Sequence, residues 1–339
     1  MSDGVPSLRE GPQRAAHARR MLLHLFWTYA FLLAALAIEC AVFEWIARAN
    51  DIPPFLSERC LILVLDNSAF LGVVSVGMTF VILTGGIDLS VGSLIALGGV
   101  VAASVTHMGG ANVWAWICLG WLAAITAGVA AGSCAGVVIT RFQIPPFIAT
   151  LALMSSLRGL GYLLVHGKPV ANLPDQYLYL GRHTIAGRVP IDVLVMLAVF
   201  VVGALALGQT RFGRHVRAIG GNEEAARLSG VPVARTKWLV YTISAALAVL
   251  GGLVLSSELG SGDPKVGLGS ELEVIAAVVV GGTSLSGGRG SIGGTFLGLL
   301  IISVLRTGLN WVNVESFTQQ VILGLVILAA VLLDRFRRV

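Results

Sequence analysis

Long stretches without a charged side chain constrain the fold of this chain more than any other feature of its sequence. The segments 27–37, 191–208, 239–255 and 321–333 carry no charged side chain, apart from Asp192 near one edge. Transmembrane helices need roughly 17–25 such residues. Only 12% of the 339 residues are charged, whereas roughly 25% are charged in an average soluble domain. The sequence therefore predicts an integral membrane protein, because so little charge cannot cover a water-facing surface.

Apolar length and loop residues divide the chain into about ten predicted membrane-spanning helices. The first apolar stretch is too long for a signal peptide, whose apolar core has roughly 7–15 residues, so we expect it to be retained. The eighth, at 271–284, is short and ends in two glycines, so we expect a short or re-entrant helix that protein or a water-filled cavity covers. The fold class is thus all-α and polytopic, with residues 21–339 as one transmembrane domain. The predicted spans are 22–47, 61–83, 88–106, 113–139, 146–165, 190–208, 238–256, 271–284, 293–308 and 317–333.

Lysine and arginine in the loops predict the orientation, because these residues accumulate on the cytoplasmic side. The N-terminal tail at 1–20, the segment 211–237 and the C-terminal residues 335–338 are all basic. Ten alternating helices place all three on one side. We therefore expect a cytoplasmic tail, a cytoplasmic loop at 211–237, and both termini in the cytoplasm. One loop on the opposite side departs from this rule, because it carries Lys168, Arg182 and Arg188.

Catalytic, metal-binding and nucleic-acid-binding functions have little support in the sequence. The four cysteines and six histidines show no metal-ligand spacing, and no G-x-x-x-x-G-K-[ST] phosphate loop occurs. The net charge of +5 lies in membrane-flanking loops rather than on one soluble face. We therefore expect no enzyme activity, no metal, no cofactor and no nucleic-acid partner, but contact with membrane lipid.

The segment 213–231 is the most informative loop. Asn222 can cap a short helix, Glu223 and Glu224 suit its positive first turn, and Gly230 can end it. Ala225 and Ala226 are then expected on a flat surface of small residues. The residues alone are equally compatible with an ordinary cytoplasmic loop helix.

Several motifs resemble a known family. Glu224-Ala225-Ala226 followed by Gly230 resembles the cytoplasmic coupling loop of ATP-binding-cassette importer permeases. The segments 84–93, 220–223 and 275–285 resemble ribose, xylose and galactose type permeases within that group. The resemblance extends from about Asn67 to the C-terminus.

This resemblance implies a non-catalytic permease that imports a monosaccharide across the bacterial cytoplasmic (inner) membrane. Its implied partners are a cytoplasmic ATP-binding-cassette ATPase, an external sugar-binding protein, and a second permease copy, most simply as a homodimer. Coupling to the ATPase would use Glu223, Glu224, Ala225, Ala226 and Gly230. The alternatives are an ion-coupled secondary transporter, or a related permease for branched-chain amino acids, nucleosides or polyols.

Six polar residues are candidates for the translocation path. Asp88 is the most prominent, because a carboxylate at membrane depth is costly and usually functional. It can equally cap the third helix with Ser90 nearby. Either role remains open from sequence alone. The six candidates are Asn67, Thr84, Asp88, Ser90, Glu271 and Glu273.

Overall fold

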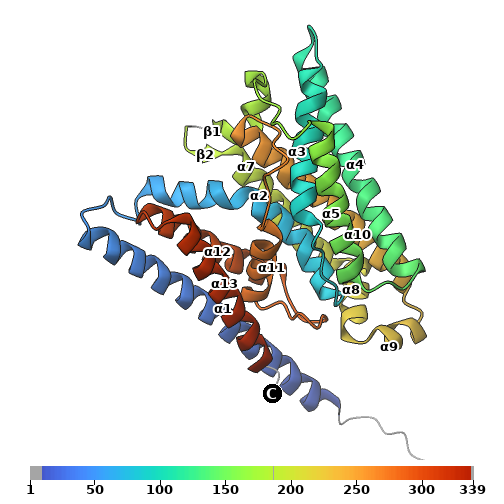
Figure 1. Cartoon of the computed structure of the whole chain (residues 1–339). Helices are drawn as coiled ribbons and strands as arrows, with labels where there is room; N and C mark the ends of the chain where they lie inside the picture. The colour runs from blue at the N-terminus through green and yellow to red at the C-terminus, as the bar shows by residue number, and fades with distance from the viewer. Residues whose placement is uncertain (1–9, 186, 337–339) are drawn as a thin grey trace, which may run out of the picture.

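A computed structural model describes residues 10–185 and 187–336, with side chains described for 29–185 and 187–332. The described chain is mainly helical, with one short antiparallel hairpin (Figure 1). The elements are α1 (Glu10–Ala49), α2 (Glu58–Leu83), α3 (Val91–His107), α4 (Val113–Arg141), α5 (Pro146–Leu164), η1 (Asp175–Leu178), α6 (Tyr179–Arg182), β1 (Thr184–Ile185), β2 (Val189–Pro190), α7 (Ile191–Gln209), α8 (Arg211–Gly221), α9 (Glu223–Leu228), α10 (Val233–Leu259), α11 (Ser270–Val280), α12 (Ile292–Trp311) and α13 (Ser316–Phe336).

Each of the ten predicted stretches contains a helix, but the helices differ in their ability to cross a membrane. In the described chain, seven are long and apolar enough to do so: α1, α2, α4, α5, α7, α10 and α12. The 17-residue α3 is just below that length, and the 11-residue α11 is far below it. At 1.5 Å per residue, α11 is about 16 Å long, half of a bilayer core of about 30 Å. Ten complete crossings therefore remain a prediction.

Helix α10 forms the centre of the bundle and packs against α2, α3 and α4. Glycines allow the close approach of α4, since Gly128, Gly132 and Gly136 recur every fourth residue on the face that meets α10. A Cβ atom added to Gly132 would lie 2.5 Å from the Cβ of Ala245. Small residues at such positions let helix backbones pack closely where lipid supplies no hydrophobic drive for association.

The segment before α11 turns into the bundle, and this explains why that helix is short. Gly262 packs against Gly99 and Ala103 of α3, whereas Gly267 packs against Gly92 at the start of α3. The chain thus runs along α3 before α11 begins. A short helix is confirmed here, but it ends at Val280 rather than at residue 284, because two glycines follow and Gly282 has φ of 88°.

The N-terminal region and the long loop before α7 differ from expectation. Helix α1 starts at Glu10, so residues 10–20 of the predicted tail are helical, as their alanine, arginine and glutamine content favours. Residues 1–9 lie outside the described residues. The loop contains η1, α6 and the hairpin β1–β2, which was not predicted. In Figure 1, the start of α1, the end of α13 and α9 lie toward one side, opposite the α3–α4 connection.

Candidate coupling and transport sites

The predicted short helix in the loop at 211–237 is confirmed as α9. The Asn222 side chain accepts a hydrogen bond from the backbone N–H of Ala225 at 2.9 Å, as an N-cap does. The helix ends at Leu228, and Gly230 follows with φ of 80°, a conformation that glycine adopts at little cost. The preceding residues were expected to be loop but form a further helix, α8, so α9 projects from a rigid support.

The inner face of α9 is fixed to the rest of the protein by both apolar and ionic contacts. Ala226 is only 5% exposed and packs in a cluster with Ile219 of α8 and Val233 of α10. The carboxylate of Glu223 accepts hydrogen bonds from Lys237 of α10 and from Arg227, the latter at 3.3 Å. The expectation that Ala226 lies on an exposed surface was therefore wrong, because the helix turns this residue inward.

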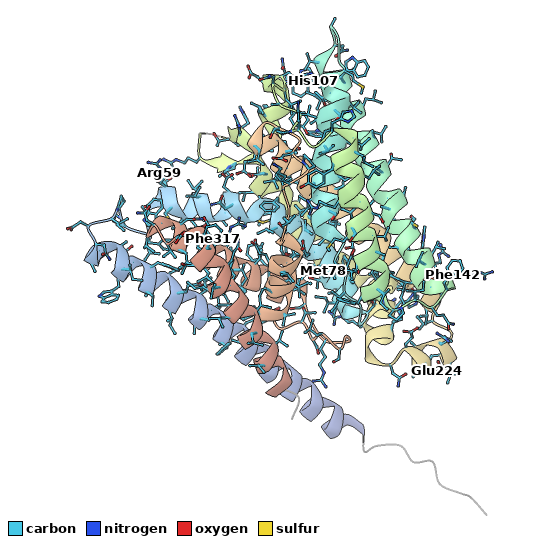
Figure 2. All side chains as sticks on the ribbon, in the orientation of Figure 1. Arg59, Met78, His107, Phe142, Glu224 and Phe317 are labelled. Atoms are coloured by element: carbon cyan, nitrogen blue, oxygen red, sulfur yellow. The ribbon has the colours of Figure 1, made fainter. Side chains whose placement is uncertain are left out.

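The outer face of α9 carries Glu224, Ala225 and Leu228, all exposed. Figure 2 shows Glu224 on the outer side of the loop, away from the membrane-spanning helices. Its carboxylate lies 3.8 Å from a guanidinium nitrogen of Arg227. Leu228 is 82% exposed, and sequence reasoning overlooked it. Its position four residues after Glu224 was the available signal, since residues four apart share one face of a helix.

Asp88 lies in a non-helical turn between α2 and α3, not within a helix as the span 88–106 implied. One carboxylate oxygen accepts hydrogen bonds from the N–H of Ser90 at 3.0 Å and from its hydroxyl at 2.6 Å. The other oxygen accepts from the hydroxyl of Ser244 in α10 at 3.0 Å. Asp88 is 2% exposed. These bonds fix the turn before α3 and tie it to the central helix, and they involve the candidate Ser90 directly.

The end of α2, the end of α8 and the loop between α11 and α12 meet beside Thr84. The backbone N–H of Gly288 donates to the carbonyl oxygen of Leu83 at 2.9 Å. Gly220, near the end of α8, lies so close that an added Cβ would be 1.8 Å from the same oxygen and 2.3 Å from the Gly288 nitrogen. We call this meeting of Leu83, Gly220 and Gly288 the glycine junction. It connects α8, which supports α9, directly to the end of α2 and to the loop between α11 and α12.

The remaining path candidates lie elsewhere. Asn67 of α2 donates to the hydroxyl of Thr307 at 3.5 Å, and Glu273 pairs with Arg306 at 2.8 Å. The Oε2 atom of Glu271 is buried without a hydrogen bond to any described residue and lies against Gly92. The structure therefore does not gather the six candidates into one site.

Sequence reasoning also missed a group of carboxyls at the start of α7. Asp192 is fully buried, and one of its oxygens accepts from the N–H of Val193 at 2.7 Å. The side chains of Asp66 and Glu258 lie near enough to interact with it electrostatically. These three residues are far apart in the sequence, so no local pattern predicts that they meet.

Comparison with known proteins places the chain in a family. The family model described as "Branched-chain amino acid transport system / permease component" matches residues 61–331. The chain is 45% identical to the ribose import permease protein RbsC of Bacillus subtilis (strain 168), over 84% of this chain and 87% of that protein. The corresponding protein of Escherichia coli (strain K12) is 41% identical, over 91% and 96%.

A third relative is the L-arabinose transport system permease protein AraH of Escherichia coli (strain K12). It is 38% identical over 91% of this chain and 89% of that protein. No solved structure matches the chain significantly. The chain, a multi-pass membrane protein by its several apolar helices, belongs to the family of branched-chain amino acid transport system permease components.

Proposed function

We propose that the chain is the permease subunit of an ATP-binding-cassette importer and that it carries a monosaccharide across the bacterial inner membrane. The observation that carries this proposal is α9, an exposed helix with an outward Glu224 and Leu228, held by its buried Ala226 against α8 and the start of the membrane-spanning α10. Such a helix suits a docking element that transmits force to the bundle. The ribose and arabinose permeases named above support the sugar assignment.

A branched-chain amino acid permease is the second candidate, because the family's description names that substrate. The family model covers a broad group, whereas the sugar permeases match nearly the whole chain at 38–45% identity. The sugar is therefore the substrate class we favour. Uptake of labelled D-ribose, L-arabinose and L-leucine by cells that express the complete importer separates the two. Import of leucine alone contradicts the sugar assignment.

In this proposal, a separate ATPase binds and hydrolyses ATP, and an external binding protein delivers the sugar. This chain is non-catalytic and carries no metal or cofactor of its own. Glu224, Ala225 and Leu228 contact the ATPase, while Glu223, Ala226 and Gly230 set the position of α9. The loop at 211–237 and both termini are then cytoplasmic, in agreement with the arrangement of α1, α9 and α13 on one side in Figure 1.

A second copy of this chain completes the path in the proposed assembly. Helix α5 supports this, since little of it is buried within one copy. Its exposed surface includes a stripe of small residues at a helical spacing, which is typical of contacts between membrane helices. The stripe consists of Ala152, Ser155, Ser156 and Gly159.

Co-purification of the ATPase subunit with the permease tests the docking face. Glu224→Arg combined with Leu228→Asp reverses a charge and removes an apolar contact on exposed positions, so we expect normal membrane insertion and loss of the ATPase. Glu58→Arg is the matched control, because Glu58 is equally exposed but lies at the start of α2, away from α9. Retention of the ATPase by the double variant would refute the docking role of α9.

A further inference from the structure

A polar pocket of about 450 Å³ opens beside α9, within the size range of pockets that bind small molecules. Its rim is formed by exposed residues of three loops, including Gly85, Asn222 and Ser286. Its floor is formed by the buried residues Thr84, Gly86, Ile219 and Tyr241. The pocket thus borders the glycine junction and reaches the central helix α10.

The hydroxyl of Tyr241 is the feature that points to a ligand. Tyr241 is 1% exposed, and its hydroxyl forms no hydrogen bond with any residue that the structure describes. A buried hydroxyl without a partner loses its hydration and gains nothing in return, so native proteins usually satisfy such groups. The oxygen lies against Gly86, where an added Cβ would be 2.2 Å from it. Both residues line the pocket, and a molecule in the pocket can supply the missing partner.

The walls of the pocket define the chemistry of that molecule. Lys237 and Glu223 line it together but pair with each other, so their charges balance. An anion such as phosphate would meet the carboxylate, and a cation would meet the ammonium group. A neutral molecule with several hydroxyls can donate to the carboxylate oxygens and accept from the Tyr241 hydroxyl. Ile219 and Pro146 offer apolar surface to its carbon atoms.

We propose that this pocket binds a small, neutral, polyhydroxylated solute from the α9 side, namely the released sugar, and that its occupancy slows further import. The sugar as ligand rests on the proposed function. A molecule in the pocket touches Tyr241 of α10, the Thr84–Gly86 turn and Glu223 of α9 at once. Binding therefore favours the arrangement in which these segments are close together, and disfavours any arrangement that moves α9 away.

Proteoliposomes that contain the complete importer test this inference, with ATP inside and the binding protein outside. The measurement is the initial uptake of labelled D-ribose with and without unlabelled D-ribose inside. We expect internal D-ribose to slow uptake by the unmodified protein, and Tyr241→Phe to remove this inhibition. Loss of one hydrogen bond should weaken D-ribose binding about tenfold. Because the hydroxyl has no hydrogen-bond partner among the described residues, Tyr241→Phe should fold normally.

Tyr177→Phe is the matched control. Tyr177 is also fully buried, but its hydroxyl bonds to Ser256 at 2.8 Å, and neither residue lines the pocket. This variant should keep its inhibition by internal D-ribose. Equilibrium binding of labelled D-ribose to the purified full-length permease gives a second readout that does not need transport.

The two readouts separate failure of the pocket from failure of the proposed function. If D-ribose is imported but internal D-ribose has no effect, the proposed inhibition is refuted while the importer assignment stands. Binding that Tyr241→Phe leaves unchanged refutes the pocket as the site. If D-ribose is not imported, its assignment as the substrate fails. The binding measurement alone then shows whether the pocket is a binding site for D-ribose. The pocket is supported as the site if Tyr241→Phe binds D-ribose more weakly than the unmodified protein while Tyr177→Phe binds it equally well.

Discussion

At the scale of single residues, Asp88 shows how a buried carboxylate can stabilise a fold by accepting hydrogen bonds. Its oxygens accept from the N–H and hydroxyl of Ser90 and from the hydroxyl of Ser244. We predict that Asp88→Ala lowers the free energy of unfolding by about 2–3 kcal/mol, because these buried donors lose their partner. Unfolding of the purified protein in detergent, followed by fluorescence, measures this loss.

The substitution Asp88→Asn separates stability from transport. The amide oxygen can still accept from Ser90, so we expect a smaller loss of stability, and sugar uptake per folded molecule close to that of the unmodified protein. Ser244→Ala is the control, because it removes one donor and leaves the carboxylate. An Asp88→Asn protein that is stable but does not transport would instead give the carboxylate a direct role in the path.

Sequence patterns predicted the individual residues of α9 only in part. The N-cap Asn222 and the terminal Gly230 were predictable, because capping depends on neighbours along the chain. The inward position of Ala226 was not predictable, since it depends on packing against Ile219 and Val233 from other helices. The exposure of Leu228 has the same cause, because the face of α9 that carries Leu228 points outward when Ala226 points inward. The contacts of Asp88 with Ser244 likewise join residues 156 positions apart.

At the scale of elements, the glycine junction directly connects α8, which supports α9, with the end of α2 and the loop between α11 and α12. We predict that Gly220→Ala lowers the free energy of unfolding by about 1–3 kcal/mol, as overpacking does, because its Cβ would lie 1.8 Å from the Leu83 oxygen. Uptake per folded molecule should fall further than stability alone explains. Uptake and unfolding measured on the same preparation test this.

Gly221→Ala provides the matched control, since the adjacent Gly221 has no atom within 4 Å of its added Cβ. Alanine there should be neutral, or stabilising by up to about 1 kcal/mol. Equal effects of the two substitutions would show that the close contact at Gly220 has no part in coupling.

The positions of the helices were predictable, because a long uncharged apolar run is visible in the local sequence without any knowledge of tertiary contacts. The inward path of the chain before α11 and the turn at Asp88 were less visible, because both are non-helical segments covered by neighbouring helices. Thr150 of α5, for example, donates to the carbonyl oxygen of Ile87 at 3.2 Å. This bond gives a partner to a backbone carbonyl that lies outside a helix. The hairpin β1–β2 is only two residues per strand, too short to show a pattern.

At the scale of the whole molecule, the stripe on α5 predicts how two copies meet. Ser156→Leu should lower the fraction of dimer, because its larger side chain prevents close approach of the helices. Mass measurement of the purified protein in detergent reports that fraction. Ala204→Leu on α7 is the control, since it adds the same side chain to another exposed small position. A dimer that survives Ser156→Leu but not Ala204→Leu would move the contact to α7.

The orientation of the molecule determines whether α9 can reach a cytoplasmic ATPase at all. Single cysteines in a protein without its four native cysteines can be labelled with a maleimide that does not cross membranes. Ser229 follows α9, Gly110 lies between α3 and α4, and both are exposed. Helix α9 and the α3–α4 connection lie at opposite ends of the bundle (Figure 1). We predict that Ser229→Cys reacts only in inside-out vesicles and Gly110→Cys only in intact cells.

The reasons for this prediction are independent of one another. Basic residues of the loop at 211–237 favour the cytoplasm, and the exposed face of α9 needs a soluble partner. Detergent-solubilised protein, in which both sites should react, controls for buried or unreactive thiols. Reaction of Ser229→Cys in intact cells would place α9 outside. The docking helix, both termini and the sugar pocket would then face away from any source of ATP, and the importer mechanism would fail as a whole.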